Sequence, residues 1–279
     1  MELTAHTRAL IELALIEDMG GGDITTRATI TDDHRSKAIV TAKEDIVLAG
    51  VPLFRAVFDR LGGDVRIDPH AADGDFVSRG TPVMEAEGPT ATLLAGERTA
   101  LNFLMRLSGI ATLTKSCVEK AAGTNARVVD TRKTTPGWRY LEKYAVRMGG
   151  GRNHRFSLSD GVLIKDNHIT ASGGIAEAVG RAKKSAPHTS RIEVEVSTTQ
   201  QITEALDAGA DILLLDNMTP DEIAKARALI AGRAMTEASG GITLENIREY
   251  AEAGVDFISL GALTHGARSV DINMKIVPV

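Results

Sequence analysis

The sequence predicts an α/β protein in two parts, an N-terminal part that mixes helices and strands (residues 1–107) followed by an α/β barrel (residues 108–267). Three observations predict it. Six short apolar runs follow residue 108, helical segments separate most of them, and each run ends in a residue with functional chemistry. Parallel strands joined by helices form a barrel or a doubly wound sheet. In a barrel the strand ends meet at one mouth, so the barrel is favoured.

The N-terminal part mixes helices and strands without a fixed period. Residues 1–19 place charged residues among apolar ones at helical spacing, and GGGDITT ends this helix and lets Asp23 cap the next turn. The run SKAIVTAKEDIVLAG is strand-like and VPLFRAVFDRLG is helical. In HAADGDFVSRGTPVMEAEG, short apolar runs between Gly and Pro turns are typical of a compact sheet layer.

A long helical pattern over residues 96–123 leads into the barrel, and we expect it to break at Gly109, which sets the boundary between the domains. The six predicted barrel strands are ARVVD, DGVLIK, RIEVEV, DILLLD, RAMTEA and DFISLG. The helices predicted between them are IAEAVGRAKKSA, TTQQITEALDAG, TPDEIAKARALI and TLENIREYAEAG. The tail, residues 268–279, contains a β-like run that we expect to return to the first domain.

Composition excludes some classes of partner. With 32 Lys and Arg against 37 Asp and Glu, the net charge is -5, which argues against binding to nucleic acid or to a membrane surface. The single cysteine, Cys117, lies in a helical apolar pattern and is expected to be a buried thiol in a reducing compartment. The first residues carry neither a signal peptide pattern nor a membrane span, so we expect a cytoplasmic protein.

Cations gather at the predicted strand ends. Arg132 and Lys133 follow the first strand, Lys165 closes the second, and His154 and Arg155 lie in GGGRNHRFSLSD. A guanidinium binds a carboxylate or phosphate through two parallel hydrogen bonds, whereas an ammonium acts as a point charge. The mixture predicts a small, strongly anionic ligand. The alternative is that each cation pairs with an internal Asp or Glu.

Two acids end the next two strands, Glu195 in the third and Asp216 in the fourth. Such a pair could hold ribose hydroxyls, bind Mg²⁺ or stabilise a sugar cation. A metal by itself is less favoured, because no His/Cys/Asp cluster has the spacing of metal ligands. The alternative is that each acid caps the helix that follows.

The pentapeptide ASGGI occurs at residues 171–175 and again at 238–242. Glycines before a helix let backbone N–H groups close on a phosphate. Only the second copy follows an apolar strand, so Ser239, Gly240 and Gly241, with Gly261 in the SLGAL turn, are the predicted phosphate site. The first copy is interpreted as a helix start.

Taken together, these residues resemble the nicotinate-nucleotide pyrophosphorylase family, also called quinolinate phosphoribosyltransferase. The resemblance covers nearly the whole chain and is carried by EDMGGGDITT, ERTALNFLMRLSGIAT, DTRKTTPGWRYLEKYAVRMGGGRNHR, LIKDNHI, VEVE, LLLDN, EASGGI and SLGALTH. It implies an N-terminal α/β sandwich domain followed by an open, TIM-like α/β barrel. It also implies a homodimer or larger homo-oligomer in which Arg98 of one chain completes the barrel mouth of another.

The resemblance implies a reaction that joins quinolinate to phosphoribosyl pyrophosphate (PRPP) with Mg²⁺ and yields nicotinate mononucleotide, pyrophosphate and CO₂, a step of de novo NAD synthesis. It implies that Lys133, Lys165, Glu195 and Asp216 are catalytic, with both acids facing the ribose hydroxyls and Mg²⁺. The other implied substrate-binding residues are Arg98, Arg132, His154 and Arg155 for the quinolinate carboxylates, Ser239, Gly240, Gly241 and Gly261 for the 5′-phosphate, and Thr131.

Three other functions are weighed against this one. A branch of the same fold associated with molybdate transport genes would share TRKT, but the intact LEKYAVRMGGGRNHR and LIKDNHI favour the quinolinate enzyme. A Schiff-base aldolase could use Lys133 or Lys165 as a nucleophile if it were desolvated. A sensor of a phosphorylated ligand would bind without turnover, and the acids beside the cations argue against it.

Overall fold

The computed structural model describes residues 1–277, which group into two compact units. The first unit contains residues 1–115, residues 135–150 and the chain from residue 266 onward, and the second contains residues 116–134 and 151–265. The grouping changes at 115/116 and 265/266, whereas the predicted boundaries are 107/108 and 267/268, and residues 135–150 of the predicted barrel fall in the first unit. Residues 278–279 of the predicted tail lie outside the described residues.

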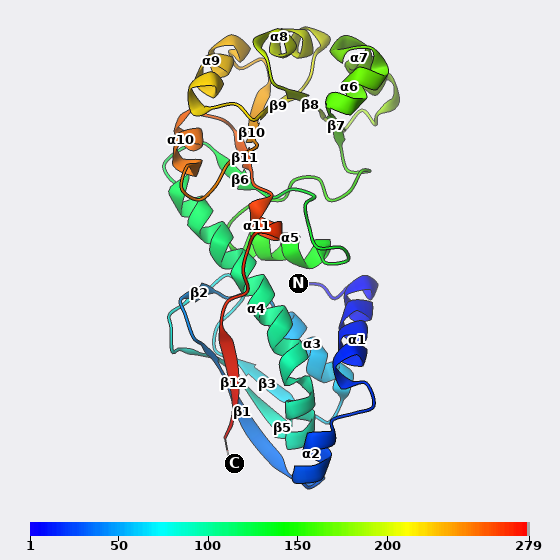
Figure 1. The fold of residues 1–279 in the computed structure, drawn as a ribbon, viewed down its shortest axis with the longest axis vertical. Helices are drawn as coiled ribbons and strands as arrows, with labels where there is room; N and C mark the ends of the chain where they lie inside the picture. Colours follow the sequence, from blue (N-terminus) through cyan, green and yellow to red (C-terminus); the bar gives the residue numbers. More distant parts are fainter. Residues whose placement is uncertain (278–279) are drawn as a thin grey trace. The chain divides into compact units, whose positions relative to one another are not determined.

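The first unit is built on an antiparallel sheet in the order β12-β1-β5-β3. Alternate residues of β1, such as Ala38 and Val40, are fully buried, which gives the period of two of a half-buried strand. The C-terminal strand β12 pairs with β1 along Lys37–Ala42, and Figure 1 shows the two side by side. The strands are β1 (Arg35–Ala42), β3 (Arg66–Pro69), β5 (Pro82–Pro89), β12 (Ile272–Val277), and the separate pair β2 (Ile46–Val47) and β4 (Phe76–Val77).

Helices accompany this sheet in the first unit. Phe54 and Phe58 of α3 are buried with their ring centroids 5.2 Å apart. Asp23, expected to cap a turn, accepts a 2.9 Å hydrogen bond from the Thr26 N–H and so begins a short helix. The helices are α1 (Ala5–Met19), α2 (Ile24–Thr29), α3 (Val51–Leu61), α5 (Arg139–Met148) and the first part of α4 (Thr90–Lys120).

Gly109 does not break the long helix. α4 runs without interruption through this position, so the expected break is wrong. A Cβ atom at Gly109 would lie 2.0 Å from the backbone oxygen of Arg268, which no side chain could tolerate. The glycine therefore serves close packing between α4 and the segment before β12. A glycine inside a helix costs only about 1 kcal/mol relative to alanine, which a well-packed helix can absorb.

The second unit is a six-stranded parallel sheet in the order β6-β11-β10-β9-β8-β7. This order, with the first strand beside the last, is that of a barrel. β6 and β7 are not hydrogen-bonded neighbours, so the barrel is open, as predicted. Arg152 instead bridges to Val129 of β6. All six predicted strands are confirmed: β6 (Arg127–Val129), β7 (Val162–Ile164), β8 (Ile192–Val196), β9 (Ile212–Asp216), β10 (Met235–Ser239) and β11 (Phe257–Ser259).

Helices follow the barrel strands, and Figure 1 shows α7, α8 and α9 along the outer side of β7–β9. Thr198 and Thr219 cap α8 and α9 with their side chains, and Pro220 occupies the first turn of α9. The four predicted helices correspond to α7–α10, whereas α5, α6 and α11 were not predicted. The helices are α6 (Asp166–Ser172), α7 (Ile175–Ser185), α8 (Thr199–Ala208), α9 (Pro220–Ile230), α10 (Ile247–Glu252) and α11 (Ala262–His265).

Two other expectations concern single features of the chain. Cys117 is a free thiol only 1% exposed, so the predicted buried thiol is confirmed. Within residues 1–277, no helix combines the length and the apolar character needed to cross a membrane.

Candidate active site

A cavity of about 670 Å³ lies at the carboxyl ends of the strands in the second unit. Every strand from β6 to β11 contributes a residue from its end or from the turn that follows. Arg98 is exposed on the part of α4 in the first unit and does not line this cavity. All the other predicted site residues do: Thr131, Arg132, Lys133, His154, Arg155, Lys165, Glu195, Asp216, Ser239, Gly240, Gly241 and Gly261.

The turn after β6 fixes Lys133. Its backbone N–H donates to Thr131 Oγ1 at 3.0 Å, and its carbonyl accepts from Thr264 Oγ1 at 2.7 Å. A Cβ atom at Gly261 would lie 2.8 Å from Lys133 Cδ. Gly261 therefore leaves room for the lysine stem to pass, and Thr131 shapes the turn that carries the two cations.

Asp130 anchors the segment that carries His154. Its side chain is fully buried at the end of β6. It accepts hydrogen bonds from Asn153 Nδ2 at 2.6 Å and from the His154 backbone N–H at 2.8 Å. The buried carboxylate thus ties two segments together across the seam of the barrel, a role that sequence reasoning did not assign.

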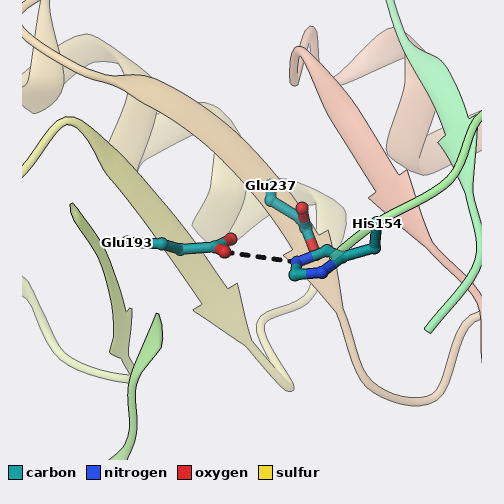
Figure 2. Close-up of side chains that lie close together, drawn as sticks. All are labelled: His154, Glu193 and Glu237. Atoms are coloured by element: carbon teal, nitrogen blue, oxygen red, sulfur yellow. Dashed lines mark hydrogen bonds and ion pairs between the residues drawn. The ribbon is translucent and has the colours of Figure 1, made fainter. Parts of the chain in front are cut away.

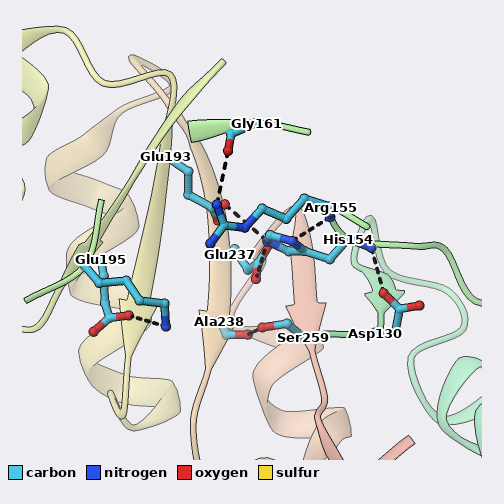
Figure 3. Close-up of polar contacts among 10 residues, drawn as sticks. Asp130, His154, Arg155, Gly161, Glu193, Glu195, Glu237, Ala238 and Ser259 are labelled. Atoms are coloured by element: carbon cyan, nitrogen blue, oxygen red, sulfur yellow. Dashed lines mark hydrogen bonds and ion pairs between the residues drawn. The ribbon is translucent and has the colours of Figure 1, made fainter. Parts of the chain in front are cut away.

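Both ring nitrogens of His154 face partners within the protein. Nδ1 accepts the Arg155 backbone N–H at 2.7 Å, and Nε2 lies 3.2 Å from Glu193 Oε2 (Figure 3). Since Nδ1 accepts a hydrogen bond, Nε2 carries the ring hydrogen, which points toward Glu193. In this arrangement His154 is held between the Arg155 backbone and Glu193, whereas the sequence analysis had grouped it with the ligand-binding cations.

Two buried acids, Glu193 and Glu237, lie beside His154, and sequence reasoning missed both. Figure 2 shows the three side chains converging, Glu193 from β8 and Glu237 from β10. Glu237 Oε1 lies 3.7 Å from His154 Nε2. Burial and, next, the charge of Glu193 raise the pKa of Glu237 to about 7. The signal was present, because Glu193 and Glu237 each precede a predicted site residue by two positions and so share its face of the strand.

Arg155 lies between these acids and Arg132. Its Nη1 donates to the Gly161 carbonyl at 3.1 Å. Partial burial and the nearby charge of Arg132 lower its pKa, while Glu193 acts in the opposite direction. The two guanidinium groups therefore repel each other in a partly desolvated cavity, which favours the arrival of an anion.

The ends of β7, β8 and β9 carry a lysine and two acids. Lys165 Nζ lies 3.2 Å from Glu195 Oε2, and Asp216 Oδ2 accepts a 2.7 Å hydrogen bond from the Asn217 side chain. None of these charged side chains is fully buried. Exchanging their present partners for a ligand therefore costs little free energy.

The glycine turn after β10 approaches Asn217 closely. Gly240 has φ +92°, and a Cβ atom there would lie 2.2 Å from Asn217 Oδ1, so glycine is required. The expectation that this turn directly precedes a helix is wrong, because α10 begins only at Ile247. A ligand here would meet loop N–H groups rather than a helix end. The first ASGGI copy does precede a helix, α7.

Two family models divide the chain between them. Quinolinate phosphoribosyl transferase, N-terminal domain, matches residues 23–108, and the C-terminal domain of the same enzyme matches residues 110–275. The chain belongs to the quinolinate phosphoribosyl transferase family.

Relatives in this family are similar over nearly their whole length. A probable nicotinate-nucleotide pyrophosphorylase [carboxylating] of Bacillus subtilis is 45% identical over 96% of this chain and 93% of its own. The chloroplastic nicotinate-nucleotide pyrophosphorylase [carboxylating] of Arabidopsis thaliana is 41% identical over 98% of this chain and 83% of its own. The crystal structure of NadC from Streptococcus pyogenes is 42% identical, with a TM-score of 0.96, and covers 100% of this chain and 99% of its own.

Family membership raises the question of which residues fit Mg²⁺. Glu195 and Asp216 present carboxylate oxygens to the cavity, and oxygen is the ligand that Mg²⁺ prefers, so this donor set fits. A second group of possible ligand atoms, one from each of His154, Glu193 and Glu237, also lies within a span of 4.8 Å. However, the ring nitrogen that faces these two acids carries a hydrogen and cannot coordinate a cation. We therefore assign no metal to that cluster.

Proposed function

We propose that the cavity transfers the phosphoribosyl group of PRPP to quinolinate and releases pyrophosphate and CO₂, which leaves nicotinate mononucleotide. One observation carries this proposal: Arg132, Arg155, Lys133 and Lys165 line one cavity together with two strand-end acids and a glycine turn. Its volume, about 670 Å³, suits small-molecule ligands. Both substrates carry several negative charges, which explains four cations in a protein whose net charge is -5.

The arginines bind the dicarboxylate. Each guanidinium can hold a carboxylate through two parallel hydrogen bonds, and partial burial strengthens both interactions. Because Arg132 and Arg155 repel each other, a dianion between them relieves that repulsion. For His154 to bind a carboxylate directly, its Nε2–H would have to leave Glu193.

Lys133 and Lys165 take the pyrophosphate side, and the acids take the ribose. Positive charge develops at the ribose as pyrophosphate departs, and Glu195 and Asp216 stabilise it electrostatically. Mg²⁺, held by PRPP and these two carboxylates, would neutralise part of the leaving group's charge. The pyridine nitrogen, positioned by the arginines, then attacks the ribose in line.

Decarboxylation follows from the new bond. A pyridine nitrogen bonded to ribose is positively charged, so the ring carbon can keep the electron pair of its bond to the adjacent carboxylate as CO₂ leaves, and a proton from solvent then takes the place of the carboxylate. The 5′-phosphate lies against Ser239, Gly240, Gly241 and Gly261, whose backbone donors can approach closely because three of the four lack a Cβ. This arrangement holds the ribose while both steps take place.

Arg98 completes the site from a second copy of the chain. It is exposed on α4, so its guanidinium is accessible to a neighbouring chain. Mixing two inactive variants, Arg98→Ala and Lys133→Ala, tests this. In a dimer with shared sites, each mixed dimer has one intact site, and random mixing restores about a quarter of full activity. If mass measurement verifies that mixed dimers have formed and no activity is recovered, the site is not shared between two chains.

The activity test uses carboxyl-labelled quinolinate with PRPP and Mg²⁺. Release of CO₂ that requires PRPP supports the proposal, and binding of both substrates without turnover contradicts it. The aldolase alternative needs a desolvated lysine, but Lys165 is half exposed and paired with Glu195. Borohydride should therefore trap no lysine adduct. We also propose a cytoplasmic location, which agrees with a chain whose one cysteine, Cys117, can form no internal disulfide.

A further inference from the structure

Glu237 lies where two cavities of the second unit meet. The substrate cavity and a second cavity of about 430 Å³ are both lined by His154, Arg155 and Glu237. Only the second cavity is also lined by Arg191 and Asp160. Glu237 can therefore exchange protons with solvent through the second cavity while a substrate fills the first.

The carboxyl group of Glu237 is not saturated with hydrogen bonds. The residue is 4% exposed, and among the described residues its Oε1 has no hydrogen-bond partner. Glu193, 5% exposed, lies beside it, with Oε2 directed to His154 (Figure 2). Two carboxylates at such close range are not easily ionised together, so one of them readily accepts a proton.

The charges around Glu237 decide which acid takes that proton. Glu193 faces the Nε2–H of His154 and stabilises the charge of Arg155, so a proton taken up by this pair of acids goes to Glu237. Ser259 on β11 faces Glu237, β9 contributes the apolar Leu214, and Glu195 further along β8 is paired with Lys165. His154 also faces Glu237, with its Nε2 3.7 Å from Glu237 Oε1, and Arg155, one of the groups assigned above to the dicarboxylate, is the cation beside Glu193.

We propose that Glu237 is a positioning residue that takes up one proton when a dicarboxylate binds to Arg132 and Arg155. The bound dianion adds negative charge to the cavity and draws the guanidinium groups away from the buried acids. Protonation of Glu237 removes the repulsion that would otherwise weaken binding. This inference rests on the proposed function, because it assumes that the arginines bind a dicarboxylate.

The proposal fixes the sign of a pH effect. Burial and Glu193 raise the pKa of free Glu237 to about 7, and the ligand raises it further. Below this pH the proton is already present, so binding takes up none. Above it, each unit of pH lowers dicarboxylate affinity by up to about tenfold, until the pH passes the pKa of the complex.

Calorimetric titration with phthalate tests the proposal, because phthalate is a dianion with adjacent carboxylates and cannot react. Binding heats at about pH 8, measured in two buffers of different ionisation enthalpy, give the number of protons taken up. We expect uptake approaching one proton for the unmodified protein and for the control Glu249→Gln, an exposed residue of α10. Glu237→Gln should take up none and should bind phthalate at about pH 8 nearly as tightly as at about pH 6.

A second variant guards against misfolding of the first. A hydrogen bond from Ser259 lowers the pKa of Glu237, so Ser259→Ala should shift the range of proton uptake to higher pH. Undiminished uptake in Glu237→Gln, or none in the unmodified protein at about pH 8, overturns the proposal. If phthalate binds at every pH without proton uptake and quinolinate is still turned over, only the proposed role of Glu237 fails. If neither binds at any pH, the proposed function fails as well.

Discussion

Lys165 Nζ lies 3.2 Å from Glu195 Oε2, so neighbouring strands of the barrel end in opposite charges that face each other. The lysine side chain is 48% exposed and the glutamate 17%, which makes this a pair that a substrate can open. The same two groups are assigned to the leaving group and to the ribose.

Glu195→Gln should reduce turnover while the KM for quinolinate stays nearly unchanged. The amide cannot stabilise positive charge on the ribose, and loss of one such group typically lowers kcat by about 10²-fold to 10³-fold. Steady-state kinetics with both substrates measure this, with Glu249→Gln as the matched control. A variant with unaltered kcat would remove Glu195 from the mechanism.

Arg132→Ala should raise the KM for quinolinate and lower turnover, with kcat/KM reduced by about 10²-fold. Arg132→Lys should recover only part of this, because an ammonium cannot make two parallel hydrogen bonds. Arg127→Ala, at the exposed start of β6, is the control and should leave quinolinate kinetics unaltered. Unchanged quinolinate kinetics in Arg132→Ala would contradict its role.

Gly261→Ala should impair the use of PRPP. The added methyl group would lie 2.8 Å from Lys133 Cδ, so it displaces the lysine stem and crowds the phosphate site. We expect the KM for PRPP to rise by about tenfold, with little effect on phthalate binding. Gly180→Ala, in a helix and with no atom within 4 Å of the new Cβ, is the control and should stabilise the protein by about 0.5–1 kcal/mol. Equal KM values for PRPP in the two variants would refute the steric argument.

Glu237→Gln should stabilise the fold most at high pH. The native pKa of Glu237 is raised from 4.5 to about 7, so its contribution to stability is present below pH 4.5 and is lost as the pH rises through 7. Glutamine resembles the protonated acid and cannot ionise. The free energy of unfolding, measured with denaturant, should therefore be raised by the substitution by up to about 3 kcal/mol more at high pH than in acid. A gain that does not depend on pH would argue against a raised pKa.

Cys117 should resist thiol reagents in the native protein. Burial, and then the charge of Glu245, raise the pKa of its thiol to about 11, so almost no thiolate exists near neutral pH. A maleimide should label it only after denaturation, and unfolded protein in the same reagent is the control. Rapid labelling of the native enzyme would show that the helix opens there.

Local pattern was sufficient to predict the barrel strands. Apolar β-branched runs separated by helical periodicity identified β6–β11, although β8 alternates its apolar residues with Glu193 and Glu195 while it remains almost wholly buried. The rule that parallel strand ends meet at one mouth was enough to gather the cations, the acids and the glycine turn. It could not supply the contacts of Asp130, whose partners lie more than twenty residues away in sequence.

Sequence by itself determined which residue types end the strands, because strand periodicity and turn chemistry are local properties of the chain. Tertiary structure decided that α4 passes unbroken through Gly109, since the helix packs on the backbone of Arg268, far away in sequence. It also decided that His154 faces Glu193 and Glu237. Those contacts depend on sheet register and on the segment that crosses the open seam, and neither leaves a periodic signal in the sequence.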